Sequence, residues 1–185
     1  GLRYLSDSSQ NILTVEDPIE YTLNGIGQTQ VNNKTGYTFA KGLRAILRQD
    51  PDIVMVGEMR DIETAQIGIQ SSLTGHLVLS TVHTNSAVAA ITRLRDMGIE
   101  SFLLASSLRT IISQRLVRRL CPHCKTKDKP SIKSIDIFGL DKNKSVYSAK
   151  GCDECNHTGY QGRIAIAECI QIDKTLKDFI HNNAS

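Results

Sequence analysis

Three short, largely apolar runs in the first 120 positions constrain the fold most strongly. They cover residues 12–15, 53–56 and 77–81, and segments with helical patterns separate them. Strands that are apolar on both faces are typical of parallel sheets covered by helices. We therefore expect an α/β domain whose strands share one direction. In such sheets, ligands bind beyond the carboxyl ends of the strands.

Helical patterns fill the spaces between and after these runs. In the clearest of them, apolar residues recur every three or four positions, which is the spacing of one buried helix face. Gly98 stands where a glycine commonly ends a helix. We expect helices over residues 38–48, 64–73, 86–97 and 101–120.

The pattern changes after Leu120. Amphipathic periodicity is lost until about residue 163, where Ile164, Ile166 and Ile170 indicate one or two strands. An apolar face at residues 176–180 indicates a short final helix. We expect three parts: an α/β core over residues 1–119, a small module over 120–162 and a C-terminal strand and helix over 163–185.

Four of the five cysteines form two Cys-x-x-Cys pairs, 27 residues apart, and they predict a metal site in the small module. Two such turns can place four thiolates around one structural Zn²⁺. The ligands would be Cys121, Cys124, Cys152 and Cys155. The alternatives are two unrelated dithiol pairs, or replacement of a thiolate by His123 or His157. Cys169 lies in an apolar run, so we expect it to be buried.

Acidic residues follow two of the predicted strands. Glu58 comes just after residues 53–56, and Glu16 and Asp17 come just after residues 12–15. Carboxylates that converge at one sheet edge could hold Mg²⁺ or activate a hydrolytic water. The alternative is a solvated strand end at Glu58, and a turn or helix cap at the Asp17–Pro18 step.

Two histidines and three arginines could act on phosphate. His76 and His83 bracket the run at 77–81, with His83 at its carboxyl end. Three arginines could neutralise phosphate charge: Arg44, Arg48 and Arg60. Structural histidines and a solvated basic helix face are the alternatives.

A phosphate-binding loop is missing from the sequence. The pattern Gly-x-x-x-x-Gly-Lys-Ser/Thr occurs nowhere in the 185 residues. The chain also begins without an initiator methionine. We therefore expect a piece of a longer protein, whose phosphate loop lies upstream of Gly1, and we expect this piece alone to be inactive.

Composition excludes several other classes of protein. Apolar residues make up 40% of the chain, which excludes a disordered tail. No apolar run approaches the ~20 residues of a membrane span, and no signal peptide is visible. The net charge of +3 is too small to indicate nucleic-acid binding by itself.

Together these segments resemble the secretion ATPase superfamily, specifically the type II secretion ATPase E proteins. Residues 14–20 are similar to the aspartate box of that family, residues 47–61 to its Walker B region, and residues 74–84 to its histidine box. The tetracysteine module, which ends in residues 159–163, completes the resemblance. It extends over essentially the whole chain.

The resemblance implies a RecA-like P-loop NTPase fold, Mg-ATP hydrolysis, a hexameric ring and zinc in the tetracysteine module. It also implies a cytoplasmic protein that docks on inner-membrane secretion-system proteins and energises protein export. Glu16 and Glu58 would share the general-base and Mg²⁺ roles, with Asp17 beside the cofactor. His83, with His76, would report on the γ-phosphate. Three arginines would couple the nucleotide state to the neighbouring subunit or domain: Arg44, Arg48 and Arg60.

Two alternatives to a type II secretion motor remain. The first is a type IV pilus assembly ATPase, a close relative of the same family. The second is a nucleic-acid-binding zinc or RecA-like module, suggested by the basic stretch at residues 115–129. Aromatic residues for base stacking are scarce near that stretch, so we expect no nucleic-acid partner.

Overall fold

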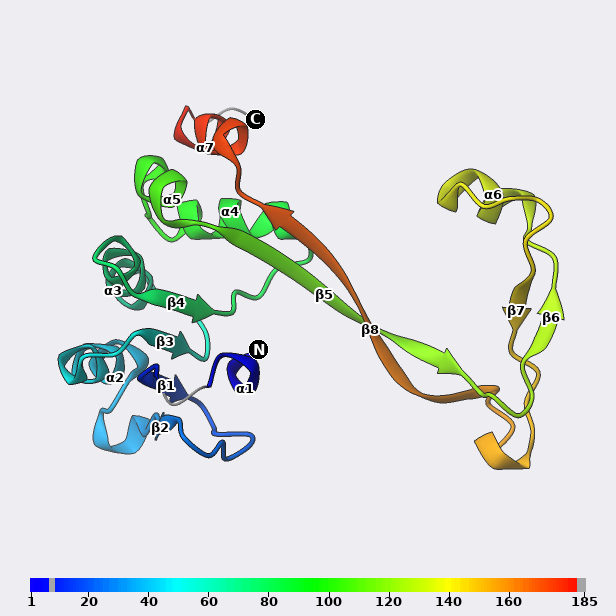
Figure 1. The fold of residues 1–185 in the computed structure, drawn as a ribbon, viewed down its shortest axis with the longest axis horizontal. Coiled ribbons are helices and arrows are strands. Elements are labelled where there is room, and N and C mark those ends of the chain that lie inside the picture. Colours follow the sequence, from blue (N-terminus) through cyan, green and yellow to red (C-terminus); the bar gives the residue numbers. More distant parts are fainter. Residues whose placement is uncertain (7–8, 183–185) are drawn as a thin grey trace. The chain divides into compact units, whose positions relative to one another are not determined.

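The computed structural model describes residues 1–6 and 9–182, which form two compact units (Figure 1). One unit contains Gly1–Ser113 and Glu168–Ser185, and the other contains Gln114–Ala167. The second unit is thus inserted into the sequence of the first. Our division at residues 119 and 162 remains a prediction about domains. Residues 183–185 of its C-terminal part lie outside the described residues.

A four-stranded parallel sheet forms part of the first unit. Its strands, in spatial order, are β2 (Gly27–Gln30), β1 (Ile12–Glu16), β3 (Ile53–Val56) and β4 (Leu77–Ser80). The three predicted strands, their common direction and the α/β class are confirmed. The sequence does not predict β2, because its four residues include no apolar side chain.

Side-chain caps fix where the longer helices of this unit begin. Thr38, Asp61, Ser86 and Asp173 each accept a hydrogen bond from the backbone N–H three residues later. They precede α2 (Phe39–Ile46), α3 (Ile62–Leu73), α4 (Ala87–Asp96) and α7 (Lys174–His181). Shorter helices are α1 (Leu2–Leu5), η1 (Asn33–Thr35) and η2 (Leu47–Gln49). None of the described helices combines the length and apolar character that a membrane crossing requires.

Two apolar clusters hold the first unit together. The first packs α2 against one sheet face and contains Leu13, Val15, Val31, Phe39, Leu43, Ile46, Val54 and Val56. The second joins α3, α4 and α7 with residues 99–105, and contains Ala65, Ile69, Leu94, Ile99, Leu104, Ala105, Ile172 and Ile180. The described residues cover the opposite sheet face only in part, since Leu77 is 44% exposed. The expected cover of both faces is therefore incomplete within this chain.

The predicted helix over residues 101–120 is wrong in its second half. Helix α5 (Ser101–Ser107) ends early, and β5 (Thr110–Leu120) pairs with β8 (Tyr160–Gln171) in a two-stranded sheet. Consecutive β-branched residues begin β5, and such side chains favour strands. The partner strand is 40 or more residues away, so local periodicity cannot reveal it. The strand signal at residues 164–170 is confirmed as part of β8.

Cys169 is exposed, and the expectation that it is buried is therefore wrong. It lies on β8, where a two-stranded sheet leaves most side chains without a covering layer. An apolar run in a sequence indicates burial only where a second layer packs on the strand.

The second unit contains residues 114–120 of β5 and 160–167 of β8, and otherwise has little regular structure. Strands β6 (Thr126–Asp128) and β7 (Val146–Ser148) form an antiparallel pair. A short helix, α6 (Ile132–Phe138), and a 3₁₀ turn, η3 (Asp153–Cys155), complete it. Its buried cluster consists of cysteines and contains no aliphatic side chain among the described residues. A unit with so small an apolar core needs another source of stability.

Candidate functional site

The loops that follow β1, β3 and β4 meet at the carboxyl edge of the parallel sheet. The N–H of Gly57 donates to the carbonyl of Val15, at 2.8 Å, and the N–H of Met59 donates to the carbonyl of Thr81, at 3.0 Å. The hydroxyl of Thr81 donates to the carbonyl of Gly57, at 2.7 Å. The segment that carries Glu58 is therefore fixed between the ends of its two neighbouring strands.

Glu58 is the centre of a charged cluster at this edge. Its side chain is 12% exposed, and its Oε1 forms an ion pair with Nη2 of Arg60. Nε2 of His83 lies 3.0 Å from the other oxygen, Oε2. Arg60 also approaches Asp17, with 3.9 Å between Nη1 and Oδ2. The structure thus brings together four of the predicted residues.

Oε2 of Glu58 is buried and has no hydrogen-bond partner among the described residues. His83 lies close to it, but their approach does not have the geometry of a hydrogen bond. A buried carboxylate oxygen without a donor is costly. It is therefore the atom of this cluster best suited to accept a water or a cation.

Arg60 keeps Glu58 ionised. The hydrogen bond from Arg60 lowers the pKa of Glu58, and burial only partly opposes this. The positive charges of Arg60 and His83 lower it further. The same hydrogen bond raises the pKa of Arg60. The carboxylate of Glu58 is therefore ionised at neutral pH and can accept hydrogen bonds or bind a cation.

Glu16 leaves the same edge but has different partners. Its Oε1 accepts hydrogen bonds from Oγ1 of Thr14, at 2.5 Å, and from Nε2 of Gln28, at 2.9 Å. It borders a cavity of about 440 Å³ that is also lined by Gln28 and Met55. Glu58 does not line this cavity, so the two carboxylates share an edge of the sheet but not their contacts.

His76, Arg44 and Arg48 are not brought into the cluster. His76 precedes β4 and so lies at the amino edge of the sheet, where its Nδ1 is 2.9 Å from the carbonyl of Ser71. Arg44 forms an exposed ion pair with Glu63, at 2.7 Å. Arg48 is exposed in η2. The functional roles predicted for these three residues remain predictions.

Sequence reasoning missed the residues that orient the site. Thr14 and Gln28 position Glu16, and Thr81 holds the backbone next to Glu58. Thr14 could have been found, since residues two apart on a strand share a face. Gln28 could not, because β2 shows no strand signal.

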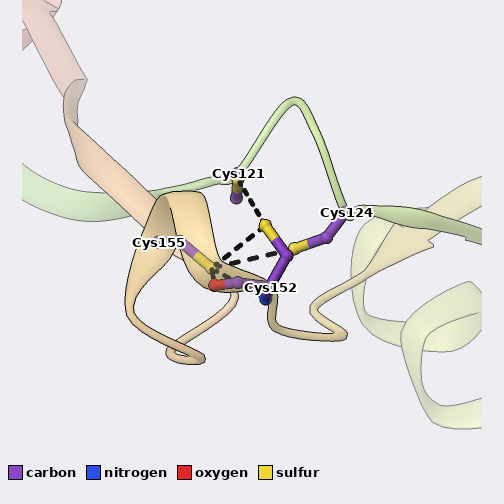
Figure 2. Close-up of side chains that lie close together, drawn as sticks. All are labelled: Cys121, Cys124, Cys152 and Cys155. Carbon is purple, nitrogen blue, oxygen red and sulfur yellow. Dashed lines mark hydrogen bonds between the residues drawn. The ribbon is translucent and has the colours of Figure 1, made fainter.

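The four paired cysteines converge in the second unit (Figure 2). Their sulfur atoms all lie within 4.8 Å of one another. The distance is 3.9 Å between Cys121 and Cys152, 3.8 Å between Cys124 and Cys155, and 3.8 Å between Cys152 and Cys155. A tetrahedral ion with metal–sulfur bonds of 2.3 Å requires sulfurs about 3.8 Å apart. The four cysteines therefore fit such an ion without help from a histidine.

Backbone N–H groups point at these sulfurs. Gly151 donates to Cys124, at 3.3 Å, and Cys155 receives the N–H groups of Cys152 and Gly159, at 3.3 and 3.2 Å. Burial raises the pKa of the Cys155 thiol, but these N–H donors and the hydrogen bonds with the thiols of Cys152 and Cys124 together lower the pKa to about 6. Burial raises the pKa of Cys152 to about 12. Such N–H donors stabilise thiolate ligands.

The whole chain matches known proteins. The family model described as type II/IV secretion system protein matches residues 1–185. Type II secretion system ATPase E of Vibrio cholerae is 58% identical over 186 residues, covering 100% of this chain and 37% of that protein. Type II secretion system protein E of Pseudomonas aeruginosa is 58% identical over 187 residues, covering 100% and 37%. The chain thus spans about 37% of the length of these curated relatives.

Solved structures share the fold. The pilus retraction motor PilT with bound ADP matches with a TM-score of 0.70 and 30% identity, over 98% of this chain and 45% of that one. The Legionella pneumophila ATPase DotB matches with a TM-score of 0.64 and 25% identity, over 96% and 42%. The α/β fold of this chain therefore resembles that of these ATPases.

Proposed function

This chain belongs to the type II/IV secretion system protein family, and on that premise we propose that it supplies the catalytic strand ends of a secretion ATPase. We assign the activity to a longer protein, since the chain spans only about 37% of its relatives. There, a RecA-like P-loop core would include a phosphate loop upstream of Gly1. The reaction would be hydrolysis of Mg-ATP to ADP and phosphate.

The observation that carries this proposal is the cluster around Glu58. A strand of the parallel sheet delivers a buried carboxylate with one unsatisfied oxygen to the edge where α/β proteins bind ligands. Arg60 fixes its charge and its orientation. A solvated glutamate at a strand end would need neither burial nor an arginine and a histidine beside it.

When bound, Mg-ATP would supply the electrophilic phosphorus and the metal charge. Glu58 would hold a water or the metal's hydration shell at Oε2. Its lowered pKa keeps the carboxylate ionised and makes it a weak base, so we assign Glu58 to orienting a water or the hydrated metal rather than to proton abstraction. His83, 3.0 Å from the same oxygen, would respond to phosphate charge there.

Glu16 and Asp17 would complete the site. Glu16 is oriented by Thr14 and Gln28 toward a cavity, which suits a carboxylate that contacts the hydrated metal or the attacking water. Arg60 contacts both Asp17 and Glu58, so this contact would hold the ends of β1 and β3 in place around a bound cofactor. We propose that Arg44 and Arg48 act outside this cluster, in coupling to a neighbouring subunit or domain. His76 lies at the opposite edge of the sheet, so we assign the phosphate-reporting role expected for both histidines to His83 alone.

We propose that the four cysteines hold one structural Zn²⁺. The spacing of their sulfurs matches a tetrahedral ion, and the unit around them has little other core. Bound zinc would supply a fourfold crosslink and leave no coordination position for substrate.

The identity values favour the type II branch of the family. The type II proteins of Vibrio cholerae and Pseudomonas aeruginosa are 58% identical to this chain, whereas the pilus motor PilT is 30% identical. We therefore propose a cytoplasmic motor that forms a hexameric ring and docks on inner-membrane proteins of a type II secretion system. Nucleic acid is a poorer fit, because Tyr160 and Tyr147 already stack with Arg118 and Lys125 of the same chain.

Glu58→Gln in the full-length protein tests the proposal. We expect the rate of ATP hydrolysis to fall by about 10²-fold, the cost of a misplaced reacting group, with ATP affinity retained. Glu16→Gln, measured in parallel, would show by its own rate loss whether Glu16 is the general base. Glu100→Gln, at an exposed glutamate without a side-chain cap hydrogen bond, is the matched control. Near-normal turnover by the Glu58 variant would remove that residue from the site.

A further inference from the structure

Glu168 lies outside the cluster around Glu58 but contacts Ala87, the residue at which the loop that carries His83 enters α4. Its Oε2 accepts a hydrogen bond from the N–H of Ala87, at 3.2 Å, across 81 residues of sequence. Ala87 is the first residue of α4 and is 1% exposed. An N–H in the first turn of a helix has no acceptor within the helix. Glu168 supplies that acceptor from a distant strand.

The loop between β4 and α4 is thereby held at both ends. At its start, the carbonyl of Thr81 accepts from Met59, at 3.0 Å, and the Thr81 hydroxyl donates to Gly57, at 2.7 Å. At its end, Ala87 donates to Glu168. His83 lies between these two anchors, so the position of its imidazole depends on both.

Packing reinforces the second anchor. Val82 of the loop and Ile170 of β8 both pack against the second apolar cluster. Ile170 follows Glu168 by two residues on the strand, so both side chains leave the same face of β8. One face of β8 therefore directs the carboxylate of Glu168 and the apolar side chain of Ile170 toward the loop region.

The charge of Glu168 also suits its position. The first turn of α4 contains no acidic residue of its own, whereas its last turn carries Arg93 and Arg95. A carboxylate at the N-terminus of a helix is favoured by the partial positive charge there. Glu168 thus provides the negative charge that the sequence of α4 lacks.

We propose that Glu168 is a positioning residue that keeps His83 within reach of Oε2 of Glu58. It acts through the backbone of Ala87 and does not touch the reacting groups. This inference rests on the proposed ATPase function, in which His83 contacts the phosphate region.

The test uses the full-length protein with Glu168→Ala, alone and combined with His83→Ala. We expect Glu168→Ala to lower kcat for ATP hydrolysis by about 10- to 100-fold, the effect of a misplaced catalytic group. In the His83→Ala background, the same change should cost less than about twofold, because the group it positions is already gone. Glu168→Gln keeps an acceptor oxygen and should retain most of the turnover. Glu100→Ala is the matched control at an exposed glutamate.

A second readout does not depend on activity. Amide hydrogen exchange at Ala87 should accelerate by at least about tenfold in Glu168→Ala and stay unchanged in Glu100→Ala. If Glu168→Ala does not fold, Ala87→Pro removes the donor instead. Proline is tolerated at the first helical position, and Ser86 before it is extended. It should cause a similar loss of kcat.

The outcomes separate the two proposals. If the unmutated protein does not hydrolyse ATP, the proposed function fails, and the exchange experiment still decides whether Glu168 anchors the loop. If ATP is hydrolysed but Glu168→Ala changes neither kcat nor exchange at Ala87, the positioning role is overturned. An equal loss of kcat with and without His83 would also overturn it, since that indicates general destabilisation.

Discussion

Replacing Cys152 by serine should weaken zinc binding by a factor that follows from the sulfur geometry. Its sulfur lies 3.9 Å from that of Cys121 and 3.8 Å from that of Cys155, so it contributes one full corner of the tetrahedron. Structural zinc sites bind with about 10–16 kcal/mol at neutral pH. An equal share for one of four thiolates is about 2.5–4 kcal/mol. Serine provides no thiolate, so we expect affinity to fall by about 10²- to 10³-fold.

Competition with a chromophoric chelator measures this affinity, and elemental analysis measures the stoichiometry. Cys169→Ser is the matched control, because the fifth cysteine is exposed on β8 and outside the cluster. It should keep one zinc per chain with unchanged affinity. The reasoning is refuted if Cys152→Ser binds zinc as tightly as the unmutated chain, or if the unmutated chain binds none.

Two further predictions concern the first unit. Gly42→Ala should lower the free energy of unfolding by about 1–3 kcal/mol in urea titrations, because the new Cβ would lie 2.8 Å from Cγ1 of the buried Val15; equal or greater stability would show that helix propensity outweighs packing. Pairing with Arg60 lowers the pKa of Glu58 in the folded state. The ion pair therefore stabilises the fold fully above the unfolded-state pKa of about 4.3, and this stabilisation is lost as the pH falls through the lower folded-state pKa. Urea midpoints followed into the acid range should therefore fall less in Glu58→Gln than in the unmutated chain, and parallel curves would contradict this.

The sheet could be predicted where burial alone determines a strand. The runs at 12–15, 53–56 and 77–81 are largely apolar, and all three form strands. Strand β2 escaped prediction because its place depends on backbone pairing with β1, which leaves no apolar signature. Strand β5 escaped because its partner, β8, lies far along the chain.

The site could be predicted where sequence order determines which edge a residue occupies. In a parallel sheet, residues after the strands gather at one edge, which correctly brings Asp17, Glu58 and His83 together. The same rule separates His76, which precedes its strand. The hydrogen bond that Gln28 donates to Glu16 and the one that Glu168 accepts from Ala87 depend on side-chain positions that no spacing rule gives.

The tetracysteine cluster was the part of the molecule that the sequence predicted most fully. Each Cys-x-x-Cys turn brings its two thiols together locally, so only the meeting of two turns remained to be established. The structure shows that meeting, with all four sulfurs within 4.8 Å. Its histidine neighbours take no part in the cluster, and His157 instead lies 3.1 Å from Asp153.

The split sequence of the first unit has a consequence for how the chain folds on the ribosome. Ile180 belongs to the same apolar cluster as Ala105 but comes 75 residues later in the sequence. At about 5–20 residues per second, translation would leave that cluster open for ~4–15 s after Ala105 is made. During that interval the nascent chain would present unfinished apolar surface, a target for chaperones, while the intervening cysteine-rich segment emerges.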